Sequence, residues 1–104
     1  AELNARAAES SYASEKLRML TLIEQAVQEF QKNKASLEYY QTSALPNADL
    51  ILKQSQAGFR GGDIAYTEYL LGLRNAIGIR ENYLKTLNDY NQSIIYIEFL
   101  SGNK

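Results

Sequence analysis

The side chains that could carry chemistry in this chain are carboxylates and tyrosines, because histidine and cysteine are both absent. Without imidazoles or thiols there is no ligand set for a Cys/His zinc site and no Ser–His or Cys–His nucleophile. Carboxylate pairs such as Glu24 with Glu29, or Glu68 with Glu81, have the chemistry of an acid and a base. Neither pair has the helical spacing that brings two side chains together, so we interpret both as solvated helix faces. We predict no enzymatic activity, no catalytic residue, no cofactor and no metal site.

The eight tyrosines have the chemistry of a stacking surface for nucleic acid. Such a surface also needs a basic groove that follows the phosphates. Here 11 Lys+Arg face 12 Asp+Glu, for a net charge of −1. We therefore predict no nucleic-acid partner and interpret the tyrosines as packing residues with a solvated hydroxyl. They are Tyr12, Tyr39, Tyr40, Tyr66, Tyr69, Tyr83, Tyr90 and Tyr96.

A glycine-containing turn, Phe59-Arg60-Gly61-Gly62-Asp63, is the third candidate site. A phosphate-binding loop would need a following Lys-Ser/Thr and a preceding strand, and the sequence has neither. We interpret the segment as the turn of a helical hairpin. Gly61 is expected in the left-handed conformation that ends the first helix, and Asp63 is expected to cap the second.

Two long antiparallel helices are expected to position this turn, because helix-favouring residues dominate on both sides of it. We predict a first helix over about 2–59, a tip turn over 60–62 and a second helix over about 63–101, which Gly102 caps. Along the first helix an apolar stripe with helical spacing includes Leu17, Leu20, Ile23, Val27, Phe30, Leu37, Ala44, Ala48, Leu52 and Phe59, with Lys34 and Gln41 as polar interruptions.

Proline 46 is the main obstacle to a continuous first helix, because it lacks a backbone donor and its ring clashes within a regular helix. We expect Pro46 to kink the first helix. The alternative is that Pro46 splits it, which gives a three-helix bundle over about 2–43, 46–59 and 63–101.

The second helix carries two stripes that differ in phase by one residue, roughly 100° around the helix. One stripe is Tyr66, Leu70, Leu73, Ile77, Arg80, Leu84, Leu87, Asn91 and Ile94; the other is Tyr69, Gly72, Ala76, Ile79, Tyr83, Thr86, Tyr90, Ser93 and Ile97. Two adjacent stripes indicate a helix with neighbours on two sides. Gly72 and Gly78 are interpreted as close-packing positions.

The length of 104 residues fits one all-α unit over 1–104. No run of about 18 apolar residues predicts a membrane span, and no signal peptide is recognisable. Met19 is the only methionine, so we expect this chain to be a hairpin cut from a longer protein.

Four segments, in this order and at these spacings, resemble the C-terminal periplasmic hairpin of the TolC-type outer-membrane efflux protein family. They are Ala44-Leu45-Pro46-Asn47-Ala48-Asp49, Gly58–Leu70, Tyr83–Asn91 and Glu98–Gly102. The resemblance covers about residues 37–102, and over 1–36 it extends only to helical character.

The resemblance implies a trimeric duct whose α-helical barrel crosses the periplasm. This chain would supply two wall helices and one tip turn, and Arg60, Gly61, Gly62 and Asp63 would dock a periplasmic adaptor (membrane fusion) protein. An inner-membrane pump would be reached only indirectly. Glu68 matches the first carboxylate of the aperture. Family members export drugs, proteins or heavy-metal ions, and these residues do not select among them.

Two alternative functions, from other classes of protein, remain open. A small secreted WXG-type binding hairpin has a similar size and an aromatic-x-Gly turn, as in Phe59-Arg60-Gly61, but its turn lies nearer the middle of the chain. A plain coiled-coil spacer would bury its stripes by self-association, and its turn would tolerate any substitution.

Overall fold

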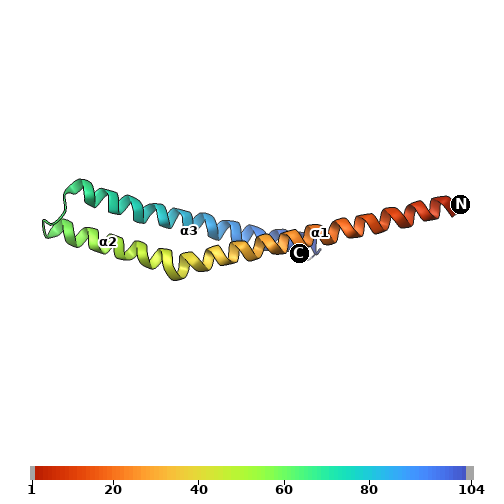
Figure 1. Ribbon diagram of the computed structural model, residues 1–104, viewed down its shortest axis with the longest axis horizontal. Coiled ribbons are helices and arrows are strands. Elements are labelled where there is room, and N and C mark those ends of the chain that lie inside the picture. Colours follow the sequence, from red (N-terminus) through yellow and green to blue (C-terminus); the bar gives the residue numbers. More distant parts are fainter. Residues whose placement is uncertain (1, 103–104) are drawn as a thin grey trace.

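The computed structural model describes residues 2–102. Its elements are α1 (Glu2–Tyr39), a π-helical turn η1 (Tyr40–Ala44), α2 (Leu45–Arg60) and α3 (Tyr66–Leu100). The first three follow one another as a single rod, the first arm, and α3 returns beside it (Figure 1). Residues 2–102 contain no strand, and the molecule measures 87 × 20 × 19 Å. The predicted all-α antiparallel hairpin is confirmed.

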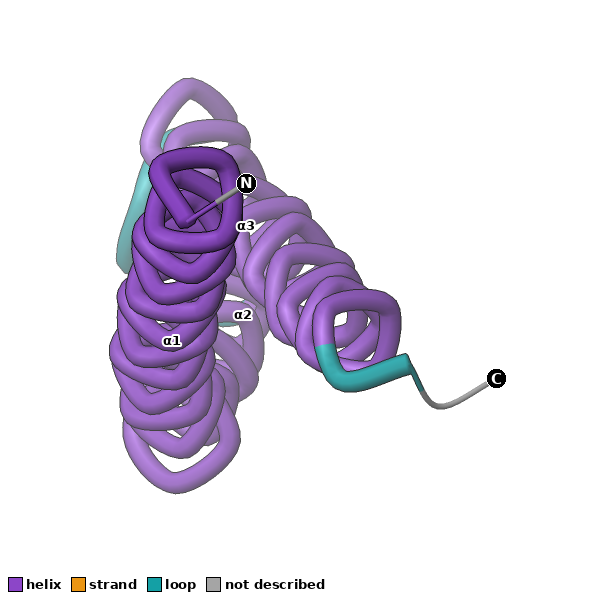
Figure 2. The backbone as a smooth tube through the Cα atoms, turned by 90° about the vertical axis from the view of Figure 1, so that its right-hand side faces the viewer, coloured by secondary structure: helices purple, strands orange, loops and turns teal. Residues whose placement is uncertain are grey.

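The first arm is bent but not divided. The bend lies in the yellow part of Figure 1, where η1 joins α2. Pro46 follows this turn as the second residue of α2, and helical structure continues through it. The expected kink is therefore present, next to Pro46 rather than at it. The three-helix bundle is wrong, because α1 and α2 each pack against α3, and an end-on view shows two rods without a third layer (Figure 2).

The seam between the arms uses the α3 stripe of small and aromatic residues. Every member of that stripe, from Tyr69 to Ile97, is buried or half-buried. The most deeply buried side chains are all small: Ala48 is 0% exposed, Ala76 2% and Ala26 4%. Small residues at these points allow the two helix backbones to approach closely, so the core is thin and depends on a tight fit.

Aromatic contacts bridge the arms along the seam. Ring centroids lie 5.4 Å apart for Phe30 and Tyr90, and 6.5 Å apart for Tyr40 and Tyr83. Packing was the expected role of the tyrosines, and it holds for Tyr40, Tyr69, Tyr83 and Tyr90, which are half-buried. The others, Tyr12, Tyr39, Tyr66 and Tyr96, are exposed.

Polar contacts between the arms lie at the edges of the seam. The Asn33 side-chain amide donates to the Asp89 carbonyl at 3.3 Å. The Arg80 guanidinium donates to the Asp49 carboxylate at 2.7 Å, and both side chains are more than half exposed. Such exposed pairs add little stability, so the apolar seam must hold the hairpin.

The N-terminal half of α1 extends beyond the end of α3 (Figure 1). Residues 2–21 are all exposed, and among them are Leu17 and Leu20, which were expected on the apolar stripe. Lys34 and Gln41 are exposed too, and the seam uses Asn33 and Tyr40 in their place. No helix within residues 2–102 is both long and apolar enough to cross a bilayer.

Candidate docking site at the hairpin tip

The tip turn is a Schellman motif built on consecutive glycines. The Asp63 N–H donates to the Gly58 carbonyl at 2.8 Å, and the Gly62 N–H donates to the Phe59 carbonyl at 3.2 Å. Gly62 has a φ of +78°, the left-handed conformation that this motif needs. These bonds use the Gly58 and Phe59 carbonyls in the last turn of α2, so the tip turn is fixed by its own backbone.

Two predictions for the turn are wrong, each by one or two residue positions. Gly61 has a φ of −78° and is the helical C-cap, and Gly62 takes the left-handed position instead. Asp63 does not cap the next helix: α3 begins at Tyr66, and its N-cap is Ala65, without a side-chain hydrogen bond. The N–H groups of both Asp63 and Ile64 donate to the Gly58 carbonyl, at 2.8 and 3.3 Å, so the end of α2 holds the chain as far as Ile64 and α3 begins only at Tyr66.

The Ile64 side chain lies against Gly58 at the end of α2. An added Cβ at Gly58 would lie 3.2 Å from Ile64 Cγ1, tighter than ordinary van der Waals contact. Gly58 therefore leaves the space in which the Ile64 side chain rests on the end of α2. An apolar contact of this kind often accompanies a Schellman motif, and here it helps to hold α2 and α3 at a fixed separation.

An aromatic cluster joins the end of α2 to the start of α3 next to the turn. Phe59 lies 5.1 Å from Tyr69 and 5.7 Å from Tyr66, centroid to centroid, and the two tyrosines are 6.4 Å apart. Tyr66 is nevertheless 60% exposed, so the cluster is partly open to solvent beside the glycines. We did not predict this cluster from the sequence, although Phe59 before the turn and the two tyrosines after it could have indicated it.

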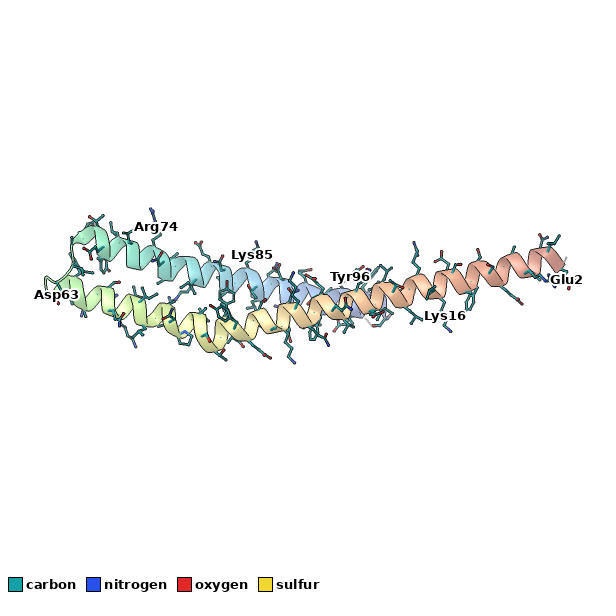
Figure 3. The ribbon with its side chains drawn as sticks, in the orientation of Figure 1. Glu2, Lys16, Asp63, Arg74, Lys85 and Tyr96 are labelled. Carbon is teal, nitrogen blue, oxygen red and sulfur yellow. The ribbon has the colours of Figure 1, made fainter. Side chains whose placement is uncertain are left out.

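The charged side chains of the tip are exposed. Arg60, Asp63 and Glu68 are all solvent-accessible, and Asp63 marks the tip in Figure 3. None of the three takes part in an ion pair among residues 2–102. Glu68 lies in the first turn of α3, where the helix dipole favours a negative charge. The four predicted docking residues are thus brought together at one exposed end, with Glu68 one turn along α3.

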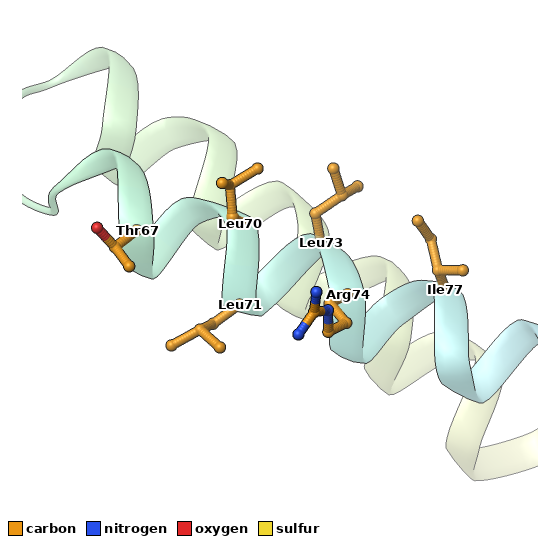
Figure 4. A pocket seen from close by; sticks show the side chains of 6 residues that line it. All are labelled: Thr67, Leu70, Leu71, Leu73, Arg74 and Ile77. Carbon is orange, nitrogen blue, oxygen red and sulfur yellow. The ribbon is translucent and has the colours of Figure 1, made fainter.

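A second apolar surface runs away from the tip along α3. It belongs to the other predicted stripe, and Tyr66, Leu70, Ile77 and Leu84 on it are all more than 40% exposed. Near the tip Leu70, Leu73 and Ile77 project to one side of the helix, and Thr67 and Leu71 to another (Figure 4).

Residues 2–102 contain no group of three or more acidic side chains that could hold a metal ion. Compared with protein-family models, with curated proteins and with solved structures, the sequence matches none of them. The geometry of the tip and of the α3 surface therefore carries the functional argument.

Replacing Gly62 by alanine should destabilise the hairpin by about 1 kcal/mol, because a left-handed conformation costs an L-residue roughly that much. Asparagine tolerates this conformation better, so Gly62→Asn should cost less than Gly62→Ala. Thermal unfolding of the 104-residue chain, followed by circular dichroism, measures both. Equal stability of Gly62→Ala and wild type would contradict the left-handed assignment.

Proposed function

We propose that this chain is a wall segment of a TolC-type efflux duct, and that its tip docks a periplasmic adaptor protein. The duct would be a homotrimer of the longer protein and would form part of an envelope-spanning assembly with the tip in the periplasm. An inner-membrane pump would act through the adaptor. The role of the chain would be structural, in the export of drugs or metal ions.

The observation that carries this proposal is the second apolar stripe of α3. A free two-helix hairpin needs one seam, and α3 already buries one against the first arm. On the adjacent stripe Leu70, Ile77 and Leu84 stay exposed, whereas its other apolar members near the seam are half-buried. Contiguous exposed apolar surface marks an interaction site, and a helix in a closed wall needs a neighbour on each side.

The tip has features that suit end-on docking. The space beside Gly62 is open to a partner, since nothing lies within 4 Å of an added Cβ there. Its backbone is fixed by internal hydrogen bonds, so a partner would meet a preorganised surface. Arg60 and Asp63 place opposite charges on either side of the two glycines, three residues apart in the sequence, which would favour a partner with a complementary pair.

The cargo would pass through the duct without being held by this segment. Met19 is the only soft metal ligand in the chain. Heavy-metal ions would therefore be conducted rather than bound by these helices, and the same holds for organic drugs.

The experiment compares Asp63→Arg with Glu81→Arg in the intact protein that carries this hairpin. Both residues are exposed acids, but only Asp63 lies at the tip, and neither substitution disturbs a left-handed glycine. We expect Asp63→Arg to lower adaptor co-purification by on the order of tenfold, because reversal of a docking charge costs about 1.4 kcal/mol. Glu81→Arg should change it little.

Export and the amount of trimer in the outer membrane are measured in the same cells. Loss of adaptor binding and export with normal trimer supports docking at the tip. Equal adaptor binding and export in both variants would contradict it, and the hairpin would then be a spacer.

A further inference from the structure

The two halves of the first arm face α3 in different phases. From α1 into the first residue of η1, one row of buried or half-buried side chains recurs every seven residues, at Ala26, Asn33 and Tyr40. In α2 they recur every seven residues as well, at Ala48 and Ser55. From Tyr40 to Ala48, however, the step is eight residues. A parallel row changes in the same way, because Ile23, Phe30 and Leu37 are followed by Leu45 and Leu52.

The extra residue coincides with the π-helical turn. The Leu45 N–H donates to the Tyr40 carbonyl, five residues back, in place of the four of an α-helix. A turn with this bond holds one residue more than an α-helical turn. Without it, everything beyond the insertion would be rotated by about 100° relative to α3. The turn therefore keeps both halves of the seam closed.

Pro46 favours the same turn for a second reason. In a regular α-helix its ring would clash with the carbonyl four residues earlier, that of Thr42, and its nitrogen could not bond to that carbonyl. Thr42 lies inside the π turn, and its hydroxyl donates to the Glu38 carbonyl at 2.8 Å. Wider winding at this point relieves the clash.

We propose that the π turn Tyr40–Ala44 contains one inserted residue and acts as a register switch between two seams. The base seam joins α1 to the C-terminal half of α3, and the tip seam joins α2 to its N-terminal half. While the π turn is held, both seams are closed. If the turn winds into a regular α-helix, one seam rotates away from α3.

The first arm also contains a row suited to the uninterrupted state. Phe30, Leu37, Ala44, Ile51 and Gly58 keep a strict seven-residue spacing across the turn. A regular α-helix would place this row along one face. In the structure all five residues are buried or half-buried, and the π turn also places Ala48, which is 0% exposed, and Ser55, which lies against Gly72, on the side that faces α3. This inference rests on the seam geometry and is independent of the proposed duct.

Deletion of one residue tests the insertion directly in the 104-residue chain. Gln41 is exposed and lies inside the π turn, so its deletion should restore a seven-residue step throughout. The deletion is made together with Pro46→Ala, which removes the ring clash, and is compared with Pro46→Ala alone. The matched control deletes the exposed Asn82 from α3 in the same background. Asn82 lies beside Tyr83, which contacts Tyr40.

We expect the Gln41 deletion to leave Tm equal to or above that of Pro46→Ala. The Asn82 deletion should lower Tm by roughly 10 °C or more, because it turns half of the α3 stripe out of the seam. Amide hydrogen exchange should be faster at 41–45 than in the neighbouring helices of the wild type, and the Gln41 deletion should slow it. If the Gln41 deletion lowers Tm as much as the control, or prevents folding, the insertion is wrong. Wild-type exchange at 41–45 as slow as in α1 and α2 would contradict the switch.

Discussion

Gly72→Ala should destabilise the hairpin by about 1–2 kcal/mol, although alanine is the better helix former. An added Cβ at Gly72 would lie 3.0 Å from Ser55 Cβ and would clash with Ser55 Oγ. The hydroxyl can rotate away, but the Cβ is fixed by the backbone of α2. Overpacking of this kind costs about 1–3 kcal/mol, which exceeds the gain of about 1 kcal/mol in helix propensity.

Gly78→Ala is the matched control on the same helix. Nothing lies within 4 Å of an added Cβ at Gly78, so the interpretation of both glycines as close-packing positions holds for Gly72 and is wrong for Gly78 within this chain. Gly78→Ala should therefore stabilise the chain by about 0.5–1 kcal/mol. Urea unfolding of both variants gives the two values with opposite signs.

A double-mutant cycle with Ser55 isolates the clash. Ser55→Gly removes both atoms that an alanine at position 72 would meet, so it should recover much of the loss in Gly72→Ala. Additive effects of the two substitutions would show that the cost arises elsewhere. A stabilising Gly72→Ala would mean that the arms are farther apart than the geometry indicates.

Ala48→Leu should have the largest effect of any seam substitution, with a loss of about 3 kcal/mol. Ala48 is 0% exposed and lies where α2 packs against α3. Leucine and alanine have similar helix propensities, so the change in stability measures how much room the seam has for a larger side chain. Since the seam has no room for a larger side chain, the arms must separate or the helix must rotate.

The control for Ala48→Leu is Ala35→Leu, at an exposed position inside α1. It should change the free energy of unfolding by less than about 0.5 kcal/mol. Unfolding by urea, followed by circular dichroism, compares the two. Equal stability of both variants would show that the closest approach of the arms lies elsewhere.

Much of the fold could be predicted from local sequence, because its causes are local. Helix-favouring composition on both sides of Gly61 and Gly62 predicts two helices, and the short connection forces them to be antiparallel. The two stripes of the second helix were visible as well, because helical spacing alone defines them. The exposed charged tip follows from its place between the helices.

Other features were decided only by tertiary packing. Which α3 stripe closes the hairpin depends on which one fits the small residues of the first arm, and Ala48 and Ser55 settle this only when both arms are in place. The left-handed residue is Gly62 rather than Gly61, because the position of the last α2 hydrogen bond selects it. Pro46 favours the π turn locally, but the mismatch in phase between the two seams exists only when both halves of the first arm contact α3. Helix existence and chain reversal were thus determined by the sequence itself, whereas phase and register were decided by contact between arms far apart in the chain.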